Sequence, residues 1–149
     1  MRKQVLLLLL FLLTLPILVN GQKVKESFRL GKYKFELIEE DSKCILSYTT
    51  RGRTKRLTLE VIPPCELETT YCGVKCKEKI IVKHYRYKDI GASVFIISGN
   101  AREGGCKAQG VLVKKNRVVL GKTTSGRIGR VEEGGCGNYE EKDFWLLSH

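Results

Sequence analysis

Residues 44–61 have the sequence CILSYTTRGRTKRLTLEV, in which apolar and polar side chains alternate on both sides of one glycine. A period of two is typical of half-buried β-strands, so this stretch predicts a hairpin with one apolar face. We place Gly52 and Arg53 at the centre of a two-residue type II′ turn, because glycine readily adopts the positive φ that this turn requires. The cross-strand pairs that follow are Tyr48 with Leu57, Leu46 with Leu59 and Cys44 with Val61.

Basic residues surround the predicted turn more densely than any other part of the chain. The whole chain carries a formal net charge of +11, which favours anionic partners. We therefore expect the turn to be a contact surface, formed by Arg51, Arg53, Lys55 and Arg56.

The prolines that follow the hairpin predict a bend and a disulfide. Pro63 and Pro64 cannot continue a paired strand, so the chain turns and Cys65 can return to the hairpin. A bridge between Cys44 and Cys65 is the result, and it contributes about 3 kcal/mol on the chain-entropy model.

The chain has six cysteines, and all of them follow residue 43. An even number in an exported chain favours disulfides over free thiols. The remaining pairs that we predict are Cys72–Cys76, which are close in sequence, and Cys106–Cys136. An interleaved pattern, in which Cys72 or Cys76 pairs with Cys106, remains open.

Further strands are expected on both sides of the hairpin. Residues 28–37 predict one strand with a bulge at residues 31–32. Two more hairpins are expected, one joining residues 79–87 to residues 92–98 and one turning at residues 115–116. Residues 94–97 are apolar on both faces, which indicates a central strand. Residues 121–137 are expected to be irregular with one short strand.

The C-terminal residues predict a short helix from about Tyr139 to Leu147. Asn138 and Glu141 have the spacing of a capping box. A helix this short needs packing to be stable in water, so we expect its aromatic end to dock on the sheet. Trp145 is then expected to be a structural plug rather than a platform for a ligand.

Together these segments predict a mainly β fold with a short C-terminal helix, cross-linked by disulfides. We expect a single antiparallel sheet of roughly six to eight strands, rolled into a small barrel or a sandwich.

Residues 1–21 have the layout of a secretory signal peptide, in which Arg2 and Lys3 precede a long apolar run. The run is shorter than the ~20 residues of a membrane-spanning helix. Processing would leave residues 22–149 as a single β-rich domain of formal charge +9 without a transmembrane segment. We expect this domain to be periplasmic or secreted.

No catalytic or metal-binding constellation stands out. Cys72, Cys76 and His84 offer three loosely spaced zinc ligands, but a disulfide is favoured in an oxidising compartment. His84 is expected to be packed in a sheet, and His149 to be a frayed end. We predict no catalytic residue, metal or cofactor, and a protein that is not an enzyme.

Residues 84–88, HYRYK, interleave aromatic and basic side chains, as nucleic-acid-binding strands do. A half-exposed strand in a basic protein explains the same pattern, so we do not expect a nucleic-acid partner. Tyr85 and Tyr87 remain candidate contact residues.

Several motifs together resemble a family of small exported bacterial proteins that have paired cysteines and no assigned activity. They are Cys44–Ile45–Leu46, Pro63–Pro64–Cys65, Tyr85–Arg86–Tyr87, Gln109–Gly110–Val111 after Cys106, and the closing segment EKDFWLLSH. The family has four cysteines, so the resemblance favours pairing of the additional Cys72 and Cys76 with each other. It implies no catalytic residue.

The sequence thus favours an exported, disulfide-bonded binding protein, such as a protein-interaction or hydrolase-inhibitor module, with an unknown protein or an anionic polymer as its partner. The contact candidates are residues 51–56 and residues 99–105. One alternative is a small cell-wall or polysaccharide hydrolase that uses converging carboxylates. Another is a polyanion-binding protein whose affinity falls steeply with salt.

Overall fold

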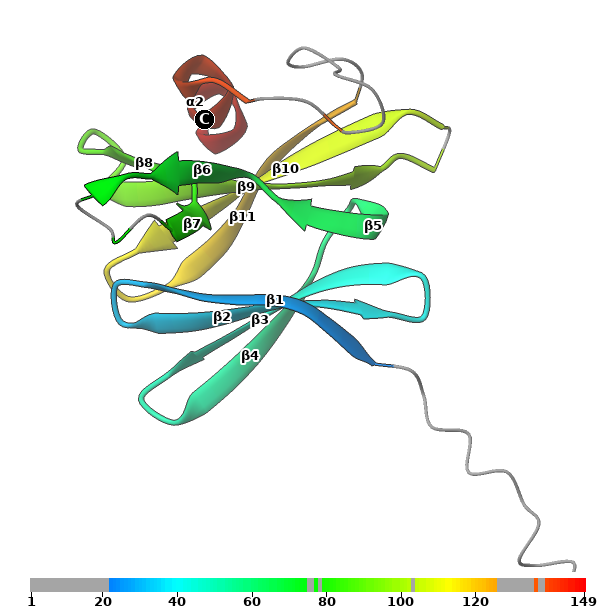
Figure 1. The fold of residues 1–149 in the computed structure, drawn as a ribbon, viewed down its shortest axis with the longest axis horizontal. Coiled ribbons are helices and arrows are strands. Elements are labelled where there is room, and N and C mark those ends of the chain that lie inside the picture. Colours follow the sequence, from blue (N-terminus) through cyan, green and yellow to red (C-terminus); the bar gives the residue numbers. More distant parts are fainter. Residues whose placement is uncertain (1–21, 75–76, 78, 103, 126–135, 137–138) are drawn as a thin grey trace, which may run out of the picture.

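The structure is a computed structural model that describes residues 22–74, 77, 79–102, 104–125, 136 and 139–149. This part of the chain forms eleven strands and one helix (Figure 1). The strands are β1 (Lys23–Leu30), β2 (Tyr33–Glu40), β3 (Lys43–Thr50), β4 (Arg53–Thr58), β5 (Ile62–Leu67), β6 (Thr69–Cys72), β7 (Lys79–Val82), β8 (His84–Tyr87), β9 (Ala92–Asn100), β10 (Cys106–Lys114) and β11 (Val118–Ser125), and the helix is α2 (Glu141–Ser148).

Two antiparallel sheets lie face to face, and α2 covers the outer face of the second (Figure 1). The first sheet has the order β1-β2-β3-β4. The second has the order β11-β10-β9-β5, and β8 also pairs with β9. The β6–β7 pair is a separate small sheet. The predicted mainly β fold with a C-terminal helix is therefore confirmed, in the form of a sandwich with more strands than expected.

The first sheet is a meander whose strands are joined by two-residue turns. The bulge predicted at residues 31–32 is wrong. Leu30 pairs with Tyr33, so residues 31–32 form a turn at which the chain reverses. Gly31 has φ +60°, and a glycine with positive φ suits a tight turn as well as it suits a bulge. Sequence alone did not separate these two uses.

The hairpin predicted around Gly52 is present, but its register differs by two residues. The turn consists of Arg51 and Gly52, with φ of 50° and 73°, so Tyr48 pairs with Lys55 rather than with Leu57. Positive φ at both central residues is typical of a type I′ turn. A shift of two residues keeps each side chain on its predicted face, because the side-chain period is two.

The second sheet contains the two other hairpins. The turn at residues 115–116 is confirmed, with Val113 opposite Val118. The hairpin predicted from residues 79–87 is only half correct, because the chain divides at Lys83. β7 pairs with β6, and only the β8 part of this segment pairs with β9. His84 is exposed rather than packed.

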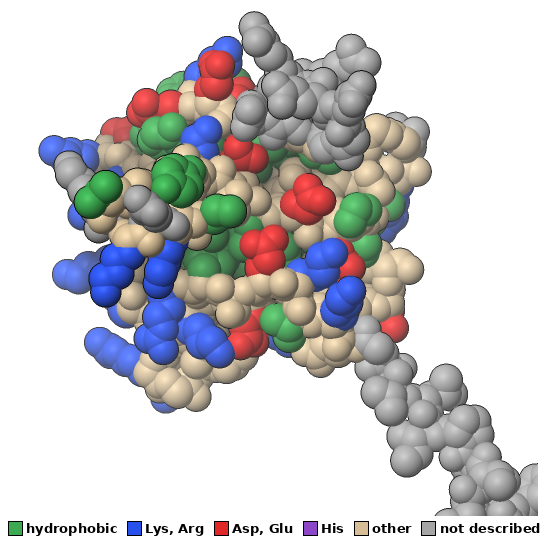
Figure 2. All heavy atoms as spheres, in the orientation of Figure 1, with side chains coloured by type: hydrophobic (Ala, Val, Ile, Leu, Met, Phe, Trp, Pro, Cys, Tyr) green, Lys and Arg blue, Asp and Glu red, His purple; other side chains and the backbone are tan. Residues whose placement is uncertain are grey.

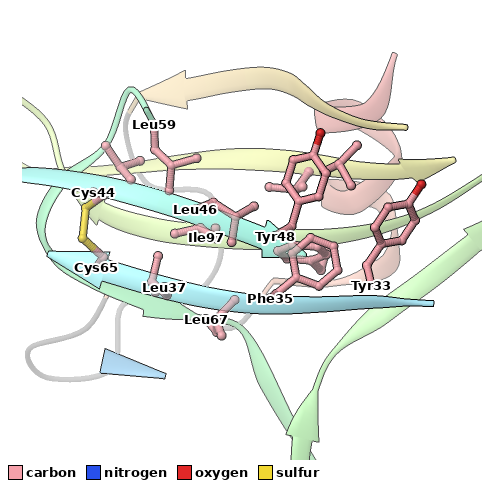
Figure 3. Packing of buried hydrophobic residues seen from close by; sticks show 14 residues of the cluster. Tyr33, Phe35, Leu37, Cys44, Leu46, Tyr48, Leu59, Cys65, Leu67 and Ile97 are labelled. Carbon is pink, nitrogen blue, oxygen red and sulfur yellow. A yellow bond between two sulfur atoms is a disulfide. The ribbon is translucent and has the colours of Figure 1, made fainter. Parts of the chain in front are cut away.

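The main core lies between the two sheets (Figure 3). The central strand β9 contributes Phe95 and Ile97 to it, and both are fully buried as predicted. The predicted Cys44–Cys65 bridge is present with a Cα–Cα distance of 6.0 Å. It joins β3 to β5 and so links the two sheets through the core. In Figure 3 the bridge lies at one end of this core, and two tyrosines lie at the other.

The other cysteine predictions have two outcomes. The predicted Cys106–Cys136 bridge is present, with a Cα–Cα distance of 5.4 Å. The predicted Cys72–Cys76 bridge involves Cys76, which lies outside the described residues. The predicted signal peptide and most of the segment expected to be irregular lie outside them as well, although β11 extends to Ser125.

A second core lies between the outer face of β9 and β10 and the helix. Phe144 and Leu147 of α2 are buried there against Val94 and Ile96 of β9. The predicted docking of the helix is confirmed, but Trp145 is not the plug, because its side chain is 46% exposed. Trp145 and Leu146, which follow Phe144, project away from the sheet.

The start of the helix also differs from the prediction. The helix begins at Glu141, and the backbone N–H of Glu140 donates a hydrogen bond of 2.7 Å to the carboxylate of Asp143. Asp143 is therefore the acidic residue of the capping box, a role that the sequence analysis assigned to Glu141. Asn138, the predicted cap, lies outside the described residues.

Candidate anion-binding site

Turns from both sheets meet at one end of the sandwich and bring five basic residues together. The β1–β2 and β3–β4 turns come from the first sheet, and the β10–β11 turn comes from the second. Lys32 Nζ donates to Asn116 Oδ1 across the two sheets at 3.4 Å. We call the exposed basic residues here the basic end: they are Lys32, Arg51, Arg53, Lys55 and Arg117. Figure 2 shows Lys and Arg side chains gathered on this side of the molecule.

The basic end surrounds an open pocket of about 520 Å³. The remaining lining consists of Tyr33, Tyr48, Thr50 and Asn116, and it contains no carboxylate among the described residues. Tyr33 and Tyr48 are almost fully buried, and their rings are in edge contact 5.8 Å apart. The pocket therefore has a buried aromatic floor and an exposed cationic rim.

Strand pairing explains why two of these cations face the pocket. Lys55 lies directly opposite Tyr48, and Arg53 lies directly opposite Thr50. Residues that pair across antiparallel strands project to the same face of the sheet. Lys55 therefore projects to the face on which Tyr48 is buried, beyond the end of the apolar core.

The five cations keep their charge available. Within the described part of the chain, none of them lies within ion-pair distance of a carboxylate. Arg56, which was predicted with them, instead pairs with Glu40 at 2.5 Å and does not line the pocket. The unpaired charges at the basic end are therefore available to a ligand.

Two polar side chains, Tyr33 and Thr50, line the floor of the pocket. Burial raises the pKa of Tyr33, the neighbouring Tyr48 raises it further, and the positive charge of Arg51 lowers it. Thr50 Oγ1 is buried without a hydrogen-bond partner among the described residues. An unsatisfied buried hydroxyl costs free energy unless a water molecule or a ligand atom reaches it.

The two predicted tyrosine contacts lie elsewhere and hold the helix. The ring of Tyr85 meets that of Phe144 edge-on, with 4.8 Å between their centroids. The hydroxyl of Tyr87 donates to the carbonyl of Glu141 at 2.9 Å. Burial, and then the nearby charge of Glu141, raises the pKa of Tyr87 to about 12.

The structure thus brings together Arg51, Arg53 and Lys55 of the predicted set. It adds Lys32 and Arg117, which sequence reasoning missed because they are far away in the chain. Each of these two residues belongs to a hairpin turn, and that was the available signal. The sequence does not show how the two sheets stack, and only that stacking brings these turns to the same end of the sandwich.

The opposite end of the sandwich holds a second open pocket, of about 720 Å³, bordered by residues of the predicted 99–105 contact loop. Its Glu60 accepts hydrogen bonds from Lys107 at 3.0 Å and Thr123 at 3.2 Å. The hydrogen bond from Lys107 lowers the pKa of Glu60. A glycosidase acid needs the opposite shift, so Glu60 does not have the properties of a general acid.

Within the described residues, no group of three or more potential metal ligands occurs. His149 is not the frayed end that the sequence predicted. Its ring stacks on Trp145 at 4.4 Å, and its Nε2 lies 3.1 Å from Asp89. The same part of the chain contains no helix that is long and apolar enough to cross a membrane.

No protein-family model matches the chain, and neither a curated protein nor a solved structure matches it. The chemistry of the site is therefore inferred from its own residues.

Proposed function

We propose that this protein is an exported, disulfide-bonded binding protein that takes an anionic partner at its basic end. The observation that carries the proposal is a pocket bordered by five cations, with neither an ion pair nor a lining carboxylate in the described part of the chain. The pocket is open, so it suits several anionic groups displayed on a larger partner better than one enclosed small anion. An acidic protein surface and an anionic polymer both have this chemistry.

The scaffold supports such a role because it holds the cations in place before binding. The basic end is formed by tight turns, and the Cys44–Cys65 bridge ties the two sheets together at the other end of the core. A preorganised surface loses less conformational entropy on binding. Charges at its rim are expected to accelerate association and to make binding sensitive to salt.

Export is part of the proposal. Residues 1–21 have the charge and hydrophobicity pattern of a signal peptide. Disulfides form and persist in oxidising compartments, and two bridges occur among the described cysteines. We therefore place the mature protein in the periplasm or outside the cell, where a hydrolase inhibitor is one concrete form of binding protein.

A polysaccharide hydrolase has less support. It would need converging carboxylates with raised pKa values. Burial raises the pKa of Glu68, but this carboxylate accepts a hydrogen bond from the Tyr139 backbone and faces Lys83 beneath the helix. Its geometry is that of a support for α2.

Binding to immobilised heparin and to polyglutamate tests the proposed function. The triple variant Arg51→Glu, Arg53→Glu, Lys55→Glu is expected to lose retention at moderate salt. The matched control reverses three exposed cations away from the basic end: Lys43→Glu, Arg102→Glu and Lys122→Glu. Equal loss in both variants would show that overall charge, and not the basic end, determines binding.

A further inference from the structure

A groove of about 420 Å³ runs between the edge of the first sheet and the small β6–β7 sheet. Five consecutive residues of β1, from Glu26 to Leu30, line one wall. Three consecutive residues of β7, from Ile80 to Val82, line the other. Successive residues of a strand point to opposite faces, so a run of consecutive residues means that the strand edge itself borders the groove.

The β1 edge has no partner strand among the described residues. Leu30 and Tyr33 flank the two-residue turn, and pairing alternates along the β1–β2 ladder. The backbone groups of Ser27 and Arg29 therefore point away from β2, into the groove. An open edge with free donors and acceptors is a template for an additional strand.

The opposite wall is apolar and exposed. Ile80 is 73% exposed and Ile81 is 36% exposed, and Tyr71 pairs with Ile80 across the β6–β7 ladder and is exposed beside it. Figure 2 shows hydrophobic side chains clustered over β6 and β7, above the Lys and Arg side chains. A contiguous exposed apolar patch is typical of an interaction site.

The groove leads into the basic end. Leu30 lines both the groove and a neighbouring hollow of about 400 Å³. Lys32 and Tyr33 line that hollow and also the pocket of the basic end. An open strand edge, an aliphatic wall and the cationic pocket of the basic end therefore follow one another along one path.

We propose that this path binds an extended polypeptide segment of the partner. The segment adds a strand to β1, directs alternate aliphatic side chains at the apolar β7 wall that contains Ile80, and places adjacent acidic residues over the basic end. Main-chain hydrogen bonds supply affinity and alternate side chains supply specificity in this mode of recognition. The placement of acidic residues over the basic end rests on the proposed function, whereas the addition of a strand to β1 rests on the groove alone.

The direction of the segment follows from the direction of β1, whose C-terminal end lies at the basic end. An antiparallel strand is slightly more stable than a parallel one. It would have its N-terminus near Leu30, so the acidic residues precede the aliphatic ones in the bound segment.

Fluorescence anisotropy with labelled peptides tests the proposal on the intact, oxidised protein. The probes are EEEEGVTVTVT, the reversed order VTVTVTGEEEE, the acidic EEEE portion alone, and a heparin oligosaccharide. EEEEGVTVTVT is expected to bind at least ~10-fold more tightly than EEEE, because it adds aliphatic burial and main-chain hydrogen bonds. Methylation of alternate backbone nitrogens on the β1-facing edge of the peptide is expected to abolish that gain.

Two protein variants locate the site. Ile80→Asp is expected to remove most of the gain, whereas Leu146→Asp, at a similarly exposed apolar residue of α2, leaves it intact. Ser27→Pro removes one N–H that faces the groove, and Ser27→Thr keeps it. Loss in Ser27→Pro alone supports strand addition, and the methylated peptide tests the same point without altering the protein.

The outcomes separate the two proposals. Equal binding of EEEE and EEEEGVTVTVT, with loss in the Arg51, Arg53 and Lys55 variant, would overturn strand addition and leave the basic end as the site. Undiminished binding of EEEEGVTVTVT to that variant would overturn the proposed function and keep the groove. Tighter binding of the reversed peptide would overturn the antiparallel assignment, and a doubled mass in solution that Ser27→Pro abolishes would show that a second copy occupies the β1 edge.

Discussion

Gly110 of β10 lies directly beneath the carbonyl of Leu147 in α2, so close that a Cβ added at position 110 would be 2.6 Å from that oxygen. The neighbouring Gly121 of β11 faces the same carbonyl. Two glycines on adjacent strands thus form the flat surface on which the last turn of the helix rests. The helix is held by shape as well as by its apolar side chains.

Gly110→Ala is therefore expected to displace α2 and to lower the free energy of unfolding by about 1–3 kcal/mol, the usual cost of overpacking. Urea unfolding measures the change. Gly73→Ala is the control, because a Cβ there meets nothing within 4 Å and the backbone does not have a positive φ. Equal stability of the two variants would mean that the helix does not rest on Gly110.

Phe144 and Trp145, which are adjacent in α2, are expected to differ sharply in how much they contribute to the free energy of unfolding. Phe144 is fully buried, so Phe144→Ala should cost about 3–5 kcal/mol through lost burial and a cavity. Trp145 is 46% exposed and stacks on His149, so Trp145→Ala should cost less than ~1 kcal/mol. Urea unfolding of the two variants checks this order, and a larger cost for Trp145→Ala would restore the plug interpretation.

Glu68 is expected to make stability depend on pH. Burial raises its pKa above the ordinary 4.5, so the folded state holds this proton more tightly than the unfolded state does. Its contribution to stability is then fully present below pH 4.5 and is lost as the pH rises through the folded-state pKa. Urea unfolding between pH 4 and pH 7 should show the stability of the protein falling relative to that of Glu68→Gln, and a relative rise would contradict the assignment.

Local patterns in the sequence predicted much of the fold. The alternation around Gly52 placed Cys44, Leu46 and Tyr48 on a buried face, and the return of Cys65 to that hairpin gave the correct bridge. These features depend on side-chain period and on a nearby bend. A shift of two residues in register left them unchanged.

The errors arose where tertiary contacts decide between equivalent local patterns. A glycine at position 31 is compatible with a bulge or a turn, and only the pairing of Leu30 with Tyr33 distinguishes them. Trp145 and Phe144 are adjacent in one helix, and which one is buried depends on how the helix is rotated against the sheet. The division of the chain at Lys83 likewise depends on β6 being available as a partner for β7.

The candidate site also contains one residue that the local sequence predicted wrongly and one that it missed, and these two arginines can be compared directly. Arg56 belongs to the cluster that the sequence predicted, but it pairs with Glu40 away from the pocket. Arg117 is distant in sequence, but it lines the pocket without an ion pair in the described structure. Arg117→Ala is therefore expected to weaken heparin binding by roughly 3- to 10-fold and to reduce the salt slope by about one, as for any cation that contacts the polyanion.

Arg56→Ala removes the same charge and is expected to change affinity by less than ~2-fold, because its guanidinium is already occupied by Glu40 and exposed pairs of this kind contribute little. Titrations at several salt concentrations measure both the affinity and the slope. Equal effects of the two substitutions would show that the polyanion responds to total charge. A larger effect of Arg56→Ala would place the contact on the outer face of β4, as the sequence cluster alone suggests.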